Sequence, residues 1–221
     1  MSDSTKPNGR VWTYVITTDA NGAPNYDPPA VTLTICKPKI RALAERGDMV
    51  IAFAGGSVHE KRAKADRRPH SVVWAGVVDQ VLPFEDYWAH PEFRVKRPTG
   101  RDHMTDNIYE PMPDGSFKLH PNQAHDERSL KTDTGGKNAL VFHDRVWRFD
   151  YGAFELPDPW NERLNMASPN HRRGQRRHHY APEEVDALAS LLAANGLPAR
   201  HHEVPSTVER TCAPSSKRTC Q

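Results

Sequence analysis

The chain has 221 residues, a net charge of only +2 and three cysteines with no Cys-x-x-Cys pair. The length suits one medium domain with extensions. The charge gives no global argument for nucleic-acid binding, and the cysteines exclude a zinc ribbon or a disulfide framework. Hydrophobic residues make up 37% of the chain and the mean hydropathy is −0.76, so we expect part of the chain to be loop or tail.

The sequence predicts neither a membrane span nor a signal peptide. No apolar stretch approaches the roughly 20 residues of a membrane span, and residues 1–10 are polar, without the apolar segment of a signal peptide. We therefore expect a cytoplasmic protein with no membrane partner. Residues 1–10 are predicted to be a disordered leader, and residues 197–221, which have no periodicity, a disordered tail.

The first strand is predicted in residues 11–17, which are β-branched and aromatic. A loop of turn-forming residues follows at 19–29. The centre of the fold is predicted in residues 36–56, where Pro38 suits the first turn of a helix and Gly47 a left-handed stop. An apolar strand over 49–54 comes next. The residues expected in the core here are Ile40, Leu43, Val50 and Phe53.

Further along the chain, the pattern predicts strands at 71–78 and 116–119 and one or two closing strands within 139–152. A short helix is expected at 83–88, whose aromatic residues are more typical of a core than of a base-stacking surface. Residues 120–138 are rich in His, Asn, Asp, Thr and Gly and are predicted to be loop. Residues 182–196 predict a helix, with proline and acids in its first turn and glycine at its end.

These elements indicate an α+β fold. We expect a small curved β-sheet, or a PUA-like barrel, with short helices on its flanks and a C-terminal helix. The main domain is predicted to span residues 11–155, followed by a basic extension and helix over 156–196.

The common sequence motifs of catalysis are absent. The chain has no Gly-x-Gly-x-x-Gly, no Walker A loop, no Gly-x-Ser-x-Gly, no His-Glu-x-x-His and no zinc-deaminase signature. Twelve histidines suggest a metal, but the adjacent pairs at 178–179 and 201–202 lack a carboxylate at the spacing of a site. We therefore predict no metal site, and the motifs identify no cofactor and no catalytic residue.

A set of polar residues at loop and element ends could bind a ligand. Amides, carboxylates and a phenol suit the edge of a base, whereas lysine and arginine suit a phosphate. Ordinary capping and loop hydrogen bonds would explain at least half of the set equally well. The candidates are Asn25, Cys36, Lys37, Arg41, Lys96, Arg97, Asp106, Asn107 and Tyr109.

The densest basic cluster lies in residues 171–179, with four arginines and three histidines. Arginine clusters in flexible segments make electrostatic contacts that do not depend on base sequence. We expect a contact with nucleic-acid phosphate there, and a solvated loop is the alternative. The residues concerned are Arg172, Arg173, Arg176 and Arg177.

Two blocks, Cys36-Lys-Pro-Lys-Ile-Arg41 and Asp106-Asn-Ile-Tyr109, are the most specific parts of a resemblance to the nucleotide modification associated domain 2 family of bacteria and phages. The likeness covers roughly residues 11–155. The family is linked to hypermodified bases in DNA, so the resemblance implies a role around modified nucleotides, without a settled reaction. The strand–helix–Gly-Asp–strand order also looks like the PUA-like barrels, a likeness of topology alone.

The resemblance implies binding or processing of a nucleotide or of a modified base in DNA. A reader module is preferred because buried cysteines are usually inert. The first alternative is an enzyme that acts on a base through Cys36 or through the cluster of Asp106, Asn107 and Tyr109. The second is a phage or defence-associated protein-interaction domain. We expect the cluster to line one nucleotide-sized pocket with Asn25, Lys37 and Arg41, the competing interpretation being a capped turn.

Overall fold

A computed structural model describes residues 5–16, 21–55, 71–122, 125–149, 154–164 and 174–199. The chain forms two compact units. The first unit consists of Met1–Asp19, Ala44–Gln80 and Phe142–Pro198, and the second of Ala20–Leu43, Val81–Val141 and Ala199–Gln221.

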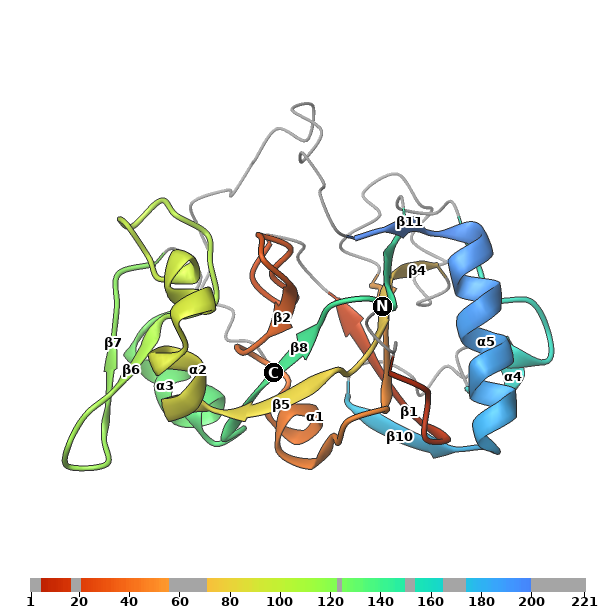
Figure 1. Ribbon diagram of the computed structural model, residues 1–221, viewed down its shortest axis with the longest axis horizontal. Coiled ribbons are helices and arrows are strands. Elements are labelled where there is room, and N and C mark those ends of the chain that lie inside the picture. Colours follow the sequence, from red (N-terminus) through yellow and green to blue (C-terminus); the bar gives the residue numbers. More distant parts are fainter. Residues whose placement is uncertain are drawn as a thin grey trace. The chain divides into compact units, whose positions relative to one another are not determined.

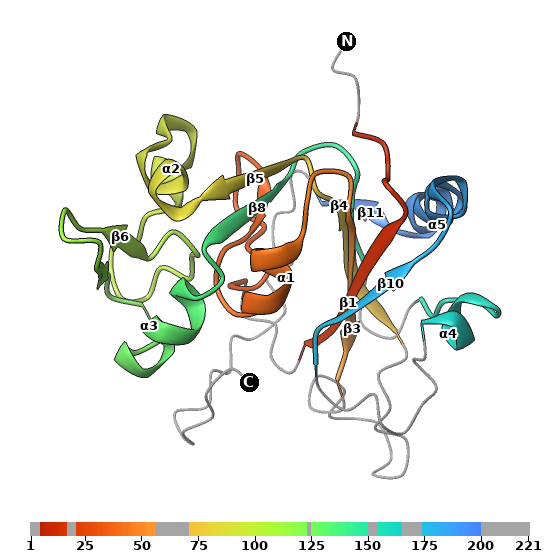
Figure 2. The same cartoon turned by 90° about the horizontal axis from the view of Figure 1, so that it is seen from below.

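The first unit contains a six-stranded sheet with the order β10-β1-β3-β4-β9-β11. Strands β1 and β3 run parallel and side by side, and the other neighbouring pairs are antiparallel (Figure 2). All six residues of β3 are buried, as its continuous apolar sequence predicts. The strands are β1 (Arg10–Ile16), β3 (Met49–Ala54), β4 (Val72–Val77), β9 (Val146–Arg148), β10 (Arg176–His179) and β11 (Leu197–Pro198).

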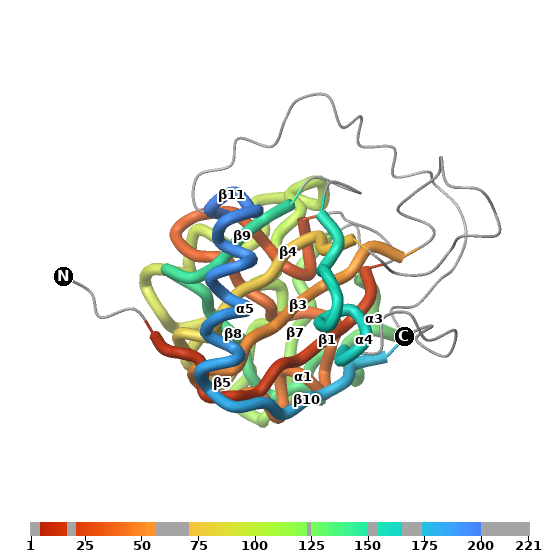
Figure 3. Tube along the Cα trace, turned by 90° about the vertical axis from the view of Figure 1, so that its right-hand side faces the viewer, coloured from red at the N-terminus to blue at the C-terminus, as the bar shows by residue number. Residues whose placement is uncertain are grey.

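Helix α5 (Pro182–Asn195) covers one face of this sheet (Figure 3). Its buried side chains include Val185 and Leu188, which share a core cluster with residues of β1, β3 and β4. The helix begins where the sequence predicts, because the Glu184 carboxylate accepts a hydrogen bond from the Ala181 N–H at 3.0 Å. The short helix α4 (Trp160–Arg163) belongs to the same unit.

The second unit is built from short elements (Figure 1). Its three-stranded sheet has the order β2-β8-β5, and β6 and β7 form a separate two-stranded sheet. The strands are β2 (Val31–Leu33), β5 (Gln80–Pro83), β6 (Tyr109–Pro111), β7 (Phe117–Leu119) and β8 (Asn138–Phe142). The helices are α1 (Pro38–Leu43), α2 (Phe84–Ala89), the 3-10 helix η1 (Pro91–Lys96) and α3 (Glu127–Thr134).

The α+β class is therefore confirmed, and the sheets of the described residues are open rather than closed into a barrel. The prediction that residues 120–138 form a loop is wrong, because α3 lies within this segment. This helix has eight residues and its buried side chain is Asp133, so apolar periodicity could not reveal it. Part of the basic segment that was expected to be flexible is also ordered, as strand β10.

The prediction of a buried side chain is wrong for one of the four expected core residues. Ile40, Val50 and Phe53 are fully buried, whereas Leu43 at the end of α1 is 48% exposed. We expect Ile40→Ala to lower the free energy of unfolding by about 2 to 4 kcal/mol, since it opens a cavity. Leu43→Ala should change it by less than about 0.5 kcal/mol. Urea unfolding of the two variants checks this, and equal losses would contradict the burial of α1.

Candidate active site

Cys36 lies in the turn between β2 and α1, and the backbone there is unusual. Cys36 has φ 55° and Lys37 has φ 45°. A left-handed backbone costs a residue with a side chain roughly 1–2 kcal/mol. Such conformations persist where surrounding structure enforces them, and they are concentrated at functional sites. Two in succession at a cysteine make this turn the first feature of a candidate site.

Hydrogen bonds on both sides of the peptide hold this turn. The Cys36 N–H donates to Asp133 Oδ1 at 2.7 Å, and Arg41 Nε donates to the Cys36 carbonyl at 2.7 Å. The same guanidinium donates to the carbonyls of Asp133 and Asn138. Gly136 leaves room for it, because a Cβ there would lie 2.4 Å from Arg41 Cζ. Arg41 therefore ties the backbone at Cys36 to the end of α3.

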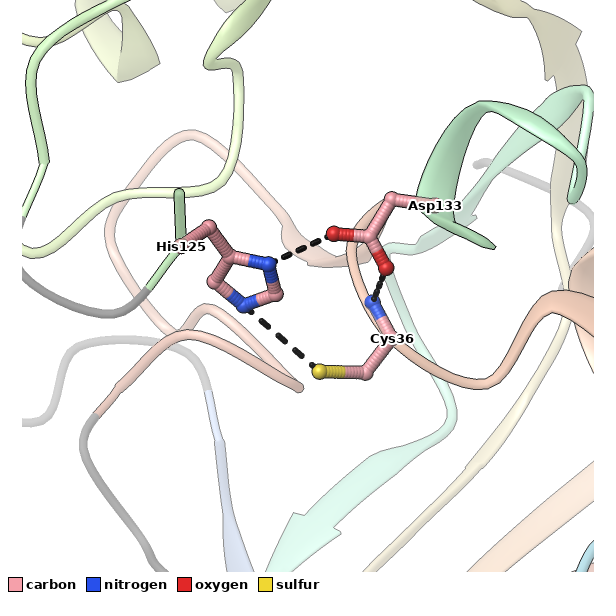
Figure 4. A group of neighbouring side chains, drawn as sticks. All are labelled: Cys36, His125 and Asp133. Carbon is pink, nitrogen blue, oxygen red and sulfur yellow. Dashed lines mark hydrogen bonds and ion pairs between the residues drawn. The ribbon is translucent and has the colours of Figure 1, made fainter. Parts of the chain in front are cut away.

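His125 stands between the cysteine and the aspartate (Figure 4). Its Nε2 lies 3.6 Å from Cys36 Sγ, and its Nδ1 lies 2.6 Å from Asp133 Oδ2, an ion-pair distance. The backbone N–H of His125 donates to Asn122 Oδ1 at 2.6 Å. The next residue, Asp126, caps α3 by accepting from the Arg128 N–H. This cap fixes His125 just before the helix whose last turn carries Asp133.

Asp133 is held as a carboxylate. Burial acts to raise its pKa, but contacts with His125, a hydrogen bond from Tyr109 and the charge of Arg41 outweigh burial and lower the pKa below its usual value. The Tyr109 hydroxyl donates to Oδ2 at 2.7 Å. Burial, together with Asp133, raises the pKa of Tyr109, so the phenol remains a donor. Burial lowers the pKa of Arg41 to about 10.

The order thiol, imidazole, carboxylate is the arrangement of a nucleophilic triad. A thiol within reach of an imidazole nitrogen can transfer its proton, and a carboxylate at the other nitrogen fixes the tautomer and stabilises the imidazolium. The 3.6 Å separation of Sγ and Nε2 is within the range for a sulfur hydrogen bond. We therefore regard Cys36, His125 and Asp133 as a candidate catalytic triad.

All three residues of the triad belong to the second unit, and all three are buried. Cys36 and His125 are each 7% exposed and Asp133 is 1% exposed. A low-dielectric surrounding strengthens the interaction between the imidazole and the carboxylate.

Three ligand atoms of the same residues lie within 4.8 Å of one another and could hold a metal ion. The hydrogen bonds favour the triad interpretation. Asp133 Oδ1 already accepts from the Cys36 N–H, and Oδ2 accepts from the Tyr109 hydroxyl. The two ring nitrogens of His125 face the thiol and the carboxylate, one each, as a triad requires. The absence of a metal site remains a prediction.

A second buried network contains three other predicted residues. Lys96 Nζ donates to Asn25 Oδ1 and to Thr32 Oγ1, both at 2.7 Å. The Thr32 hydroxyl donates to Asp106 Oδ2 at 2.7 Å, and the Tyr87 hydroxyl donates to Oδ1 at 3.0 Å. Burial lowers the pKa of Lys96 to about 8 and raises that of Asp106. The buried lysine and carboxyl each have hydrogen-bond partners, and a structural role explains this network.

The remaining candidates have other surroundings or lie outside the described residues. Arg97 stacks on Trp88, 4.0 Å from the ring centroid, and the Asn107 amide donates to the Phe93 carbonyl at 3.1 Å. Lys37 is partly buried beside the nucleophile. Arg176 and Arg177 lie on β10, whereas Arg172 and Arg173 are outside the described residues. Ligand binding by any of the predicted residues stays a prediction.

Sequence reasoning included Cys36 and missed both of its partners. His125 is 89 positions further along the chain and Asp133 is 97 positions away. Both fall in the segment that was predicted to be loop. The available local signal was Asp126 followed by Glu127, an N-cap and a first-turn acid, which would have placed a helix after His125.

The family described as nucleotide modification associated domain 2 matches residues 8–209. The match includes the basic extension as well as both units of the fold. No curated protein and no solved structure matches the chain. In the described part of the chain, no helix is long and apolar enough to cross a membrane.

Proposed function

This chain belongs to the nucleotide modification associated domain 2 family, and on that premise we propose that it is a thiol enzyme of nucleotide modification. Cys36 is the nucleophile, His125 the general base and acid, and Asp133 the group that orients the imidazole. The observation that carries the proposal is the pair of short separations at His125, 3.6 Å to the thiol and 2.6 Å to the carboxylate. The substrate is a nucleotide, or a modified base in DNA, that carries an acyl group.

Acyl transfer is the reaction class that this relay suits best. His125 Nε2 takes the proton of Cys36 as Sγ bonds to the carbonyl carbon. The tetrahedral intermediate collapses, and the leaving amine or alcohol takes that proton from His125. An acceptor, water or an amine, then gives a proton to His125 and attacks the thioester carbon. Cys36 leaves as a thiolate and regains the proton.

The contacts support an enzyme over a reader module. A reader needs polar side chains that are available to a base, and Asn25, Lys96 and Asp106 are engaged with one another or with protein hydroxyls. The nucleotide part of the proposal depends on the family alone. Contact of Arg176 and Arg177 with nucleic-acid phosphate is a further part of the proposal, supported by their position on a strand at the edge of its sheet.

The proposal predicts that His125 activates the thiol. In a chain with Cys212 and Cys220 replaced by serine, alkylation of Cys36 by iodoacetamide is followed by intact mass between about pH 5 and 10, with a chelator present. We expect the midpoint of the alkylation rate against pH to lie below the pKa of ~8.5 of an ordinary cysteine. The same chain unfolded in urea gives the reference midpoint. His125→Ala should slow alkylation at neutral pH by about tenfold or more. Equal rates in the two proteins would refute the triad.

A covalent adduct tests the reaction itself. The protein is incubated with nucleotides and oligonucleotides that carry normal or acylated bases, quenched in acid and weighed. We expect the mass of the wild type to increase by that of the acyl group, attached to Cys36 as a thioester. Cys36→Ser, which lacks the thiol, should form no thioester. Thermal shifts of equal size in both proteins, without any adduct, would favour the reader module instead.

A further inference from the structure

We propose that Tyr109 is a positioning residue that tunes the triad by sharing one oxygen of Asp133 with His125. This inference depends on the proposed thiol chemistry. The Tyr109 hydroxyl donates to Asp133 Oδ2 at 2.7 Å, and the same oxygen lies 2.6 Å from His125 Nδ1. The phenol therefore acts on the nucleophile through two intervening groups and does not touch it.

Packing fixes the phenol in place. Tyr109 begins β6 and is 2% exposed. Its ring meets the Phe84 ring edge-on, with centroids 6.3 Å apart, and it packs in a cluster with Ile35, the residue before Cys36. A ring held on several sides has little rotamer freedom, so its hydroxyl has a defined direction.

Two donors on one carboxylate oxygen compete for its charge. The phenol takes part of the negative charge of Oδ2, which leaves less to stabilise an imidazolium at Nδ1. Without the hydroxyl, Asp133 would hold the protonated His125 more strongly. Proton transfer from Cys36 to His125 would then become easier, and thiolate would form at a lower pH.

Among the described residues, the other charged or titratable groups that contact Asp133 belong to the triad or to its scaffold. Cys36 and His125 face Asp133 from their own segments, and Arg41 faces it from α1. Tyr109 differs from all three because its hydroxyl can be removed without changing the charge of the cluster. Since burial raises the pKa of Tyr109, the phenol is neutral across the whole pH range of the test.

The experiment compares Tyr109→Phe with Tyr87→Phe in the chain with Cys212 and Cys220 replaced by serine. Tyr87 is a matched control, because its buried hydroxyl also donates to a buried carboxylate, that of Asp106 in the second network. The pH midpoint of Cys36 alkylation is measured for both, beside His125→Ala. We expect Tyr109→Phe to lower the midpoint by about 0.5 to 1 pH unit, and Tyr87→Phe to leave it unchanged.

Each outcome separates the two proposals. If His125→Ala changes the alkylation rate and Tyr109→Phe does not lower the midpoint, Tyr109 is structural only and this inference fails while the triad stands. An equal shift in Tyr87→Phe also overturns it, because the effect would then follow from any lost buried hydroxyl. If His125→Ala has no effect, the proposed function itself fails. Melting temperatures of both phenylalanine variants show whether either has lost its fold.

Discussion

Gly136→Ala is expected to lower the free energy of unfolding by about 2 to 4 kcal/mol and to slow the alkylation of Cys36. A Cβ at this position would lie 2.4 Å from Arg41 Cζ and 2.5 Å from Nη2. Separations of that kind cannot be tolerated, so the guanidinium must move. The carbonyls of Cys36 and Asp133 would then lose the donor that they share.

Arg41 cannot move cheaply. Its guanidinium is fully buried, makes three hydrogen bonds to backbone carbonyls and lies 5.3 Å from the centroid of the Phe84 ring. Burial lowers its pKa to about 10, against the opposing charge of Asp133. A displaced guanidinium would leave buried carbonyls without a partner, at about 1 to 3 kcal/mol for each group.

Gly100→Ala is the control for this prediction. No atom lies within 4 Å of a Cβ at Gly100, so the same chemical change should leave stability within about 0.5 kcal/mol of the wild type. Urea unfolding gives the free energies, and intact mass gives the alkylation rates. Equal stability of the two variants would mean that Arg41 can be repositioned without loss, and that the turn at Cys36 does not depend on it.

The elements that could be predicted from the sequence are those with strong local signals. Strand β3 is a continuous apolar run, and α5 has proline at its first position and glycine after its last. Leu43 was misplaced because α1 ends after six residues, so the helical spacing from Ile40 does not continue as an apolar face. Short helices follow periodicity poorly, since two turns hold too few apolar positions.

The site could be predicted only in part, because it is assembled by contacts between distant residues. Asp106 and Tyr109 are three positions apart, yet Asp106 belongs to the network of Lys96, whereas Tyr109 donates to Asp133 of the triad. Closeness in sequence therefore does not by itself place two side chains in one hydrogen-bond network. The partners of Cys36 came from a segment whose polar composition is typical of loops, and only the tertiary fold buries its aspartate.

Lys96→Met is expected to lower the free energy of unfolding by about 3 kcal/mol at neutral pH. The variant keeps an unbranched side chain that reaches the position of Cε, and it removes the ammonium. Asn25 Oδ1 and Thr32 Oγ1 each lose a donor at 2.7 Å. The Asp106 carboxyl, which is also buried, loses the nearby positive charge that opposes its desolvation. Urea unfolding of the variant measures the loss.

The pH dependence of this difference identifies the charge itself. Burial lowers the pKa of Lys96 from 10.5 to about 8 in the folded protein. Between these two values the unfolded chain binds a proton that the folded protein has released, so stability rises with pH. The full rise is about 3 kcal/mol. Lys96→Met lacks the titrating group and cannot show this rise. The difference in free energy of unfolding between wild type and variant should therefore widen from about pH 8 upwards.

Lys39→Met is the matched control, because Lys39 is exposed on α1. Its stability should follow the wild type at every pH, with the rise above pH ~8 retained.

The raised pKa of Asp106 acts with the opposite sign, since its folded form keeps a proton above the ordinary 3.8, and stability falls with pH across that window. A gap between wild type and Lys96→Met that stays constant with pH would show that Lys96 releases its proton at the same pH in the folded and unfolded chains, so that burial does not lower its pKa.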